Sequence, residues 1–275
     1  MERVVILGGG ESGLGAAVLA KQKGYNVWLS DNGAISQASK DVLLHHQIDW
    51  EEGGHSMPEI LNAQWVVKSP GIPEGVPVVQ AAIKAGIPVI SEIEWASKFT
   101  DARIVGITGT NGKTTTASLT HFILKQELEV ALAGNIGDGF AYAVAKSPQP
   151  NYVLELSSFQ LDGIVKFKPH IAAIINITPD HLDRYNNDFE QYVAAKFRIA
   201  MNQGPEDYLI YDADDPVITA HLENHPVRSK LMPFSLEKTL EEGAYIENET
   251  IIIKHLNNPI QMPIATLGLQ GKNNT

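Results

Sequence analysis

The segment Gly109-Thr110-Asn111-Gly112-Lys113-Thr114 combines two glycines with a lysine and two threonines. The glycines free the backbone to wrap phosphate oxygens, the lysine neutralises β- and γ-phosphates, and a threonine hydroxyl can bind Mg²⁺. The strict pattern G-x4-G-K-[ST] is not met, because Ile107 stands where its first glycine belongs. The G-K-T core is intact between an expected strand (104–108) and an expected helix (114–126). The segment therefore predicts an ATP site.

Three further residues beyond this segment have types suited to chemistry. Glu155 lies at the end of an apolar run, where a carboxylate is costly unless it is paired or bound to a metal; beside an ATP site, Mg²⁺ is its natural partner. His181 follows another expected strand between Asp180 and Asp183, and we expect it to belong to a site. Lys196 is the single lysine of a largely apolar helix, a pattern that also fits a lysine whose ammonium group reaches the surface.

A second glycine turn, Gly8-Gly9-Gly10-Glu11-Ser12-Gly13, fits G-x-G-x-x-G between a strand and a helix. Such a turn lets the backbone approach a pyrophosphate, and Asp31 at the end of the next strand could meet a ribose hydroxyl. Taken alone, the turn favours NAD; another nucleotide, or a tight turn without a ligand, remains an alternative. The loop 68–73 is expected at the same sheet edge, as a ligand loop or simply as a turn made by Pro and Gly.

Alternating strands and helices must position these residues. The expected strands are 4–7, 27–30, 65–68, 89–90, 104–108, 152–156, 171–175 and 208–211, and the expected helices are 13–24, 78–85, 114–126 and 189–201. This alternation predicts an α/β fold with parallel strands. Segments 244–247 and 250–255 predict a small β appendage in the form of a hairpin.

Two phosphate-type turns in one sheet are rare, so a domain boundary is expected near 93–102. Residues 1–93 are expected to form a Rossmann-like parallel-sheet domain, and residues 94–275 a P-loop ATPase-type α/β domain. A length of 275 residues suits two domains.

Composition excludes several classes of protein. No cysteine is present, which excludes disulfides and thiolate metal sites. The net charge of −11 argues against nucleic acid or an anionic membrane surface as a partner. The sequence has no apolar run of about 18 residues and no signal peptide, so a cytoplasmic protein is expected.

Together these motifs resemble the Mur ligases, ATP-dependent amide-bond-forming enzymes of bacterial peptidoglycan synthesis. Residues 108–114 look like the family's P-loop, and residues 155–161 and 180–185 look like the member that adds D-glutamate. The resemblance runs from the first glycine turn to Gly271. It implies that the first domain holds UDP rather than NAD.

The resemblance also implies roles for individual residues. Positions that match ATP contacts are Gly109, Thr110, Asn111, Gly112, Lys113, Thr114, Thr115 and Asn274. Positions that match contacts to the UDP substrate are Glu11, Ser12, Asp31, Asn32, Gly71, Asn135, Ser157, Gln160 and His181. Two Mg²⁺ ions are expected on Thr114, Glu155, His181 and a carbamylated Lys196, and the catalytic set is Lys113, Glu155, His181 and Lys196.

The implied reaction joins D-glutamate to UDP-N-acetylmuramoyl-L-alanine through an acyl phosphate made with ATP. The alternatives are a sister Mur ligase or a folylpolyglutamate-synthase-like ligase, an NAD-dependent dehydrogenase, and a non-catalytic nucleotide-binding scaffold. The family's third domain and the last helix of its central domain are expected to be missing after Thr275, so the chain is expected to bind the UDP substrate better than it turns it over. A monomer is expected.

Overall fold

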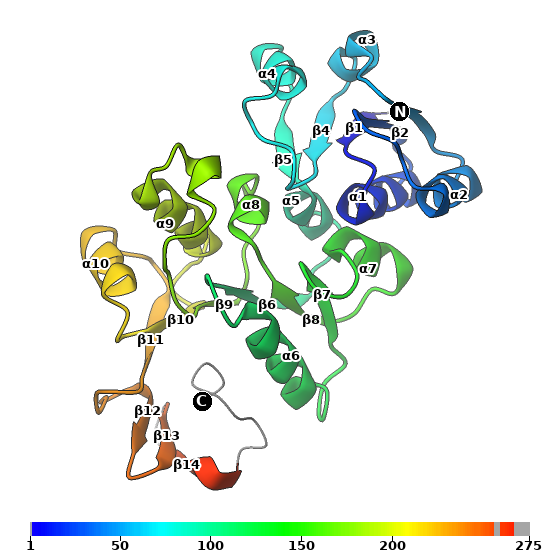
Figure 1. Cartoon of the computed structure of the whole chain (residues 1–275). Helices are drawn as coiled ribbons and strands as arrows, with labels where there is room; N and C mark the ends of the chain where they lie inside the picture. The colour runs from blue at the N-terminus through cyan, green and yellow to red at the C-terminus, as the bar shows by residue number, and fades with distance from the viewer. Residues whose placement is uncertain (1, 256–258, 267–275) are drawn as a thin grey trace. The chain divides into compact units, whose positions relative to one another are not determined.

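The computed structural model describes residues 2–255 and 259–266. The chain divides into two compact units. The first comprises Met1–Ala102, Glu129–Tyr152 and Ser158–Phe167, and the second comprises Arg103–Leu128, Val153–Ser157 and Lys168–Thr275. Strands and helices alternate along most of the chain (Figure 1). The predicted α/β class is confirmed, whereas the limit between residues 93 and 94 stays a prediction.

Sheet A of the first unit is entirely parallel, in the order β3-β2-β1-β4-β5. Its strands are β1 (Arg3–Leu7), β2 (Asn26–Asp31), β3 (Asp49–Glu52), β4 (Trp65–Lys68) and β5 (Val89–Ser91). Its helices are α1 (Glu11–Gln22), α2 (Gln37–His45), α3 (Met57–Leu61), α4 (Pro77–Lys84) and α5 (Glu92–Ser97). The strand order reverses between β1 and β4, and ligands of open α/β sheets bind outside the carboxyl ends of strands at such a reversal.

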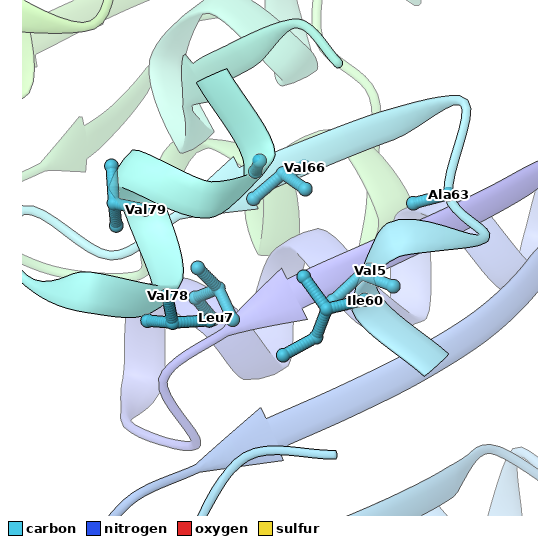
Figure 2. Close-up of a cluster of buried hydrophobic side chains, with 8 residues drawn as sticks. Val5, Leu7, Ile60, Ala63, Val66, Val78 and Val79 are labelled. Atoms are coloured by element: carbon cyan, nitrogen blue, oxygen red, sulfur yellow. The ribbon is translucent and has the colours of Figure 1, made fainter. Parts of the chain in front are cut away.

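Apolar packing on both faces holds β1 at the centre of sheet A. Residues 4–7 are fully buried, as expected for a central parallel strand. On one face, Val5 and Leu7 pack in a cluster with Ile60 of α3 and Val78 of α4 (Figure 2). The carboxyl end of β1, where the first glycine turn begins, is therefore rigidly placed.

The second sheet, sheet B, has the order β14-β13-β12-β11-β10-β9-β6-β8-β7. Its strands are β6 (Arg103–Thr108), β7 (Ala131–Gly134), β8 (Asn151–Glu155), β9 (Ile171–Ile174), β10 (Tyr208–Asp212), β11 (Lys230–Ser235), β12 (Gly243–Glu247), β13 (Thr250–Lys254) and β14 (Ile260–Pro263). The predicted hairpin is present, since β12 and β13 pair antiparallel. Its turn residues Asn248 and Glu249 have φ of 48° and 57°, the left-handed values that a two-residue turn needs.

Several short elements were not predicted. In the first unit they are α2, β3, α3, α5, α7 (Phe140–Lys146) and α8 (Ser158–Asp162), and in the second α10 (Pro216–Asn224), β11 and β14. Strand β3 reads DWEE, and its three carboxylates disfavour a strand; it lies at the edge of sheet A, where charge is tolerated. The region 93–102, where a domain boundary is expected, contains most of α5, whose Trp95 is fully buried, and the first segment of the first unit ends there at Ala102. None of the described helices is long and apolar enough to cross a membrane.

Candidate nucleotide-binding sites

A cavity of about 780 Å³ opens at the carboxyl end of sheet A. The first glycine turn lines it, together with Asp31 and Asn32 at the end of β2, His55 just before α3, Met57 at the start of α3, and the loop 69–73. Five residues predicted to contact a nucleotide thus line one cavity: Glu11, Ser12, Asp31, Asn32 and Gly71. His55 and Met57 were not predicted, because nothing in their local sequence marks them.

The first glycine turn is built so that its backbone faces the cavity. Gly8 has φ of +100°, and a Cβ on Gly13 would lie 1.9 Å from the carbonyl oxygen of Gly8. The carboxylate of Asp31 accepts the backbone N–H of Gly9 at 2.5 Å and that of Gly33 at 2.7 Å. Helix α1 follows with Gly10 at its N-cap and no side-chain cap, so its first N–H groups suit an anion.

The loop 69–73 borders the same cavity. Buried Lys68 donates a hydrogen bond from Nζ to the carbonyl oxygen of Ile72 at 2.7 Å, which closes the loop on itself. The hydroxyls of Ser12 and Ser69 are buried without a hydrogen-bond partner within the described part of the chain. A buried hydroxyl without a partner is costly, so both groups suit a polar ligand.

The second glycine turn forms a phosphate-type loop after β6. Gly109 has φ of +155°, and Gly112, with φ of +80°, precedes α6 (Lys113–Leu124), which also lacks a side-chain cap. The Asn176 side chain fixes the backbone of the loop: its Oδ1 accepts the N–H groups of Thr110 at 3.1 Å and Asn111 at 2.8 Å. No role was predicted for Asn176, although its place two residues after the end of β9 could have indicated one.

Thr114 and Glu155, two of the residues predicted to bind Mg²⁺, meet at this loop. The Thr114 hydroxyl donates to Glu155 Oε2 at 2.7 Å, and Glu155 is 2% exposed at the end of β8. The described residues contain no group of three or more His, Asp or Glu that could hold a metal. A hydroxyl and a carboxylate suit Mg²⁺, which usually completes its shell with water and phosphate oxygens.

Two lysines converge on the backbone of the loop. Lys113 Nζ donates to the carbonyl oxygens of Gly109 at 3.0 Å and Thr110 at 2.8 Å. Lys196 Nζ donates to the same Gly109 oxygen at 2.8 Å and lies 4.5 Å from the centre of the Tyr192 ring. Lys196 is 1% exposed, so the alternative that its ammonium group reaches the surface is wrong. Burial, reinforced by the charge of Lys113, lowers the pKa of Lys196 to about 7.

The other predicted residues belong neither to the lining of the cavity at sheet A nor to the described contacts around the phosphate-type loop. Asn135 is exposed after β7, and Gln160 is buried in α8; both belong to the first unit. Ser157 and His181 belong to the second unit, where His181 is exposed with its Nε2 3.5 Å from a carboxylate oxygen of Asp180. Thr115 lies in the first turn of α6, and Asn274 lies outside the described residues.

Comparisons with known proteins match both parts of the chain. Residues 2–91 match the Mur ligase MurD-like N-terminal domain, and residues 107–274 match the Mur ligase middle domain. UDP-N-acetylmuramoylalanine–D-glutamate ligase of Christiangramia forsetii is 54% identical over 99% of this chain and 62% of that protein. The protein of the same name from Bacteroides fragilis is 50% identical over 100% of this chain and 62% of that protein. The chain thus spans about 62% of the length of these curated relatives.

Two solved structures resemble the fold. UDP-N-acetylmuramate:L-alanyl-gamma-D-glutamyl-meso-diaminopimelate ligase from Neisseria meningitides has a TM-score of 0.65 at 20% identity, covering 100% of this chain and 90% of that chain. UDP-N-acetylmuramate–alanine ligase MurC from Thermotoga maritima has a TM-score of 0.54 at 20% identity, covering 95% and 60%. At this identity the likeness concerns the fold alone.

Proposed function

We propose that this chain, which belongs to the Mur ligase family, is the nucleotide-binding part of an enzyme that uses ATP to join D-glutamate to UDP-N-acetylmuramoyl-L-alanine. The names of its relatives at 54% and 50% identity support this activity. Because the chain spans about 62% of their length, the complete reaction is proposed for the protein at the length of its relatives. The NAD alternative has no such support, since residues 2–91 match a MurD-like domain.

The proposed reaction forms one amide bond and converts ATP to ADP and phosphate. The alanyl carboxylate of the UDP substrate attacks the γ-phosphorus of ATP, and the bond from that phosphorus to the ADP oxygen breaks. The D-glutamate amine then attacks the carbonyl of the acyl phosphate, and a tetrahedral intermediate releases phosphate while the nitrogen loses a proton. Several anions meet in this reaction, so the site needs fixed positive charge.

The observation that carries the proposal is that Lys113 and Lys196 both donate to the carbonyl oxygen of Gly109. One lysine is enough to neutralise phosphates in a P-loop. The second amine, with a pKa lowered by burial to about 7, is a nucleophile near neutral pH. Its attack on CO₂ would form an N–C bond, release one proton and leave a carbamate anion. That anion would pair with Lys113 or bind a cation.

Thr114 and Glu155 are the residues that we propose to hold Mg²⁺. Their oxygens, 2.7 Å apart, suit this ion, and a cation would offset the cost of the buried Glu155 carboxylate. When bound, Mg²⁺ would supply positive charge against the phosphate oxygens of ATP. A second ion, and the part of His181 in binding either ion or the UDP substrate, stay predictions.

The diphosphate of the UDP substrate is proposed to bind at the uncapped N-terminus of α1, within the cavity of about 780 Å³. The chain's net charge of −11 does not oppose this, because backbone N–H groups supply the local attraction. Substrates of this kind fit a cytoplasmic enzyme. The monomeric state stays a prediction.

ADP release by the protein at the length of its relatives tests the function, with UDP-N-acetylmuramoyl-L-alanine present and single amino acids added in turn. We expect D-glutamate alone to stimulate release. Lys113→Ala is expected to slow the reaction about 100-fold or more, because it removes a fixed charge beside the phosphates. Lys125→Ala, an exposed lysine just after the same helix, is the matched control and should leave the rate unchanged.

Other outcomes would favour other functions. Stimulation by L-alanine or diaminopimelate would indicate a sister ligase, and ADP release that needs no amino acid would indicate a nucleotide-binding scaffold. Isotope-labelled bicarbonate, followed by carbon NMR, tests the carbamate. A carbamate signal that persists in Lys196→Arg would exclude Lys196 as its site.

A further inference from the structure

A chain of hydrogen bonds links strands β2 and β3 of sheet A to His55. None of its residues belongs to either glycine turn. Ser30 on β2 and Glu51 on β3 are direct cross-strand partners. The Ser30 hydroxyl lies 2.6 Å from Glu51 Oε1 and 2.6 Å from His55 Nδ1. Ser30 is fully buried, and His55 lines the cavity of about 780 Å³. The chain of bonds thus runs from the edge of the sheet into that cavity.

The charge of Glu51 settles which atom donates in each bond. Burial raises the pKa of Glu51, but hydrogen bonds from Ser30 and Ser56 outweigh it and leave the pKa below its usual value. Glu51 is therefore a carboxylate, which only accepts, so the single hydroxyl hydrogen of Ser30 points to Glu51. The Ser30 oxygen must then accept from His55, which places a hydrogen on Nδ1. The polar atom that the imidazole has left for a ligand is Nε2.

The position of His55 points to the nucleoside half of a bound nucleotide. Its partner Ser30 directly precedes Asp31, and an acidic residue at this strand end commonly meets the ribose. Here both Asp31 oxygens already accept backbone N–H groups, from Gly9 and Gly33. The diphosphate is expected at the turn after β1, and β1 is the direct neighbour of β2, the strand that carries Ser30.

We propose that His55 is a specificity-determining residue of the cavity, whose Nε2 accepts a hydrogen bond from a nucleoside O–H or N–H, with Ser30 and Glu51 as the positioning residues that fix its tautomer. This inference rests on the proposed function, because it takes the ligand to be a uridine nucleotide. The donor is a ribose hydroxyl or the uracil imide N–H, and ligand analogues separate the two.

Calorimetric titration of the 275-residue chain tests the assignment with four probes: UDP, its 2′-deoxy analogue, its N3-methyl analogue and inorganic diphosphate. We expect the unmodified chain to bind either the 2′-deoxy or the N3-methyl analogue about threefold to tenfold more weakly than UDP, because that analogue lacks the group that donates to His55. A loss of this size corresponds to the free energy of one hydrogen bond. In His55→Phe, UDP should bind as weakly as that analogue, so the discrimination disappears, while inorganic diphosphate binds unchanged. Ser30→Ala should reduce the discrimination without abolishing UDP binding.

The control variant is His45→Phe, an exposed histidine of α2 that does not line the cavity, and it should behave as the unmodified chain. If His55→Phe fails to fold, His55→Gln, which keeps an acceptor oxygen, should retain discrimination. UDP binding unchanged in His55→Phe would overturn the assignment, as would an equal loss for inorganic diphosphate. If the unmodified chain failed to bind UDP, the proposed UDP site itself would be wrong.

Discussion

Two buried glutamates of α5 differ sharply in their surroundings. Glu94 Oε2 accepts the consecutive backbone N–H groups of Val165, Lys166 and Phe167 at 2.9, 2.9 and 2.7 Å. Glu92 accepts the N–H of Ala141 with Oε1, whereas its Oε2 is buried without a partner among the described residues. Burial, with a smaller contribution from the charge of Glu11, raises the pKa of Glu92 to about 7 despite that hydrogen bond.

Glu92→Gln is expected to stabilise the protein above pH 7 and to change little near pH 5. The folded state keeps the Glu92 proton up to about pH 7, while a glutamate in the unfolded chain loses it near pH 4.5. The free energy of unfolding therefore falls as pH rises between these values and stays low above them. Glutamine keeps the acceptor for Ala141 and carries no charge. We expect a gain of roughly 1–3 kcal/mol at pH 8, measured by urea unfolding.

Glu94→Gln is the matched comparison on the same helix. It removes the charge that three N–H groups share, so it should lower stability at both pH values by about 1–3 kcal/mol. A loss of stability in Glu92→Gln that grows with pH would show that the Glu92 carboxylate is favoured in the folded state.

Single residues were predictable where a local motif marked them. Lys113 and Thr114 could be predicted as site residues because the loop carries its own pattern. His55 was not, because its environment comes from Ser30 and Glu51 on two other strands. The buried state of Lys196 likewise depends on the distant Gly109 oxygen, which the helix sequence does not reveal.

At the scale of elements, the two glycine turns were predictable because each stands between an apolar strand and a helix. The missed elements are short and receive their stability from packing that the local pattern does not show. Helix α7, for example, packs against α1, from which it is more than a hundred residues distant in sequence. A Cβ on Gly15 of α1 would lie 2.9 Å from the backbone of Tyr142, a close approach that only the folded structure discloses.

The first turn offers a paired test of what its glycines do. A methyl group on Gly13 would collide with the Gly8 carbonyl at 1.9 Å, whereas one on Gly10 would meet no atom within 4 Å. We expect Gly13→Ala to cost several kcal/mol, about as much as a severe backbone clash. Gly10→Ala should fold normally, since its φ of −74° suits alanine, yet bind UDP more weakly because the methyl group occupies the path of the diphosphate. Thermal unfolding of both variants measures the loss of stability, and UDP titration measures the loss of binding. If Gly13→Ala were as stable as Gly10→Ala, the predicted clash with the Gly8 carbonyl would be wrong.

At the scale of the whole molecule, the two units are interleaved along the chain. Segments 129–152 and 158–167 belong to the first unit, although they lie within the residues expected to form a second, continuous domain. Strand β8 itself runs across one of these limits, between Tyr152 and Val153. Unfolding of the first unit would therefore release the segment that joins α6 to β8, and the second unit would lose the constraint that this folded connection places on those two elements.

This interleaving predicts one cooperative unfolding transition for the 275-residue chain. A ligand present at 100 times its dissociation constant adds about 2.7 kcal/mol to the folded state. We expect UDP and Mg-ATP each to raise the midpoint of the same calorimetric transition, with additive effects because they bind different sites. Continuous domains limited at residue 93 would instead give two transitions, one shifted by UDP and the other by Mg-ATP. Gly13→Ala should lower the whole single transition if the units unfold together, and only the UDP-sensitive one if they do not.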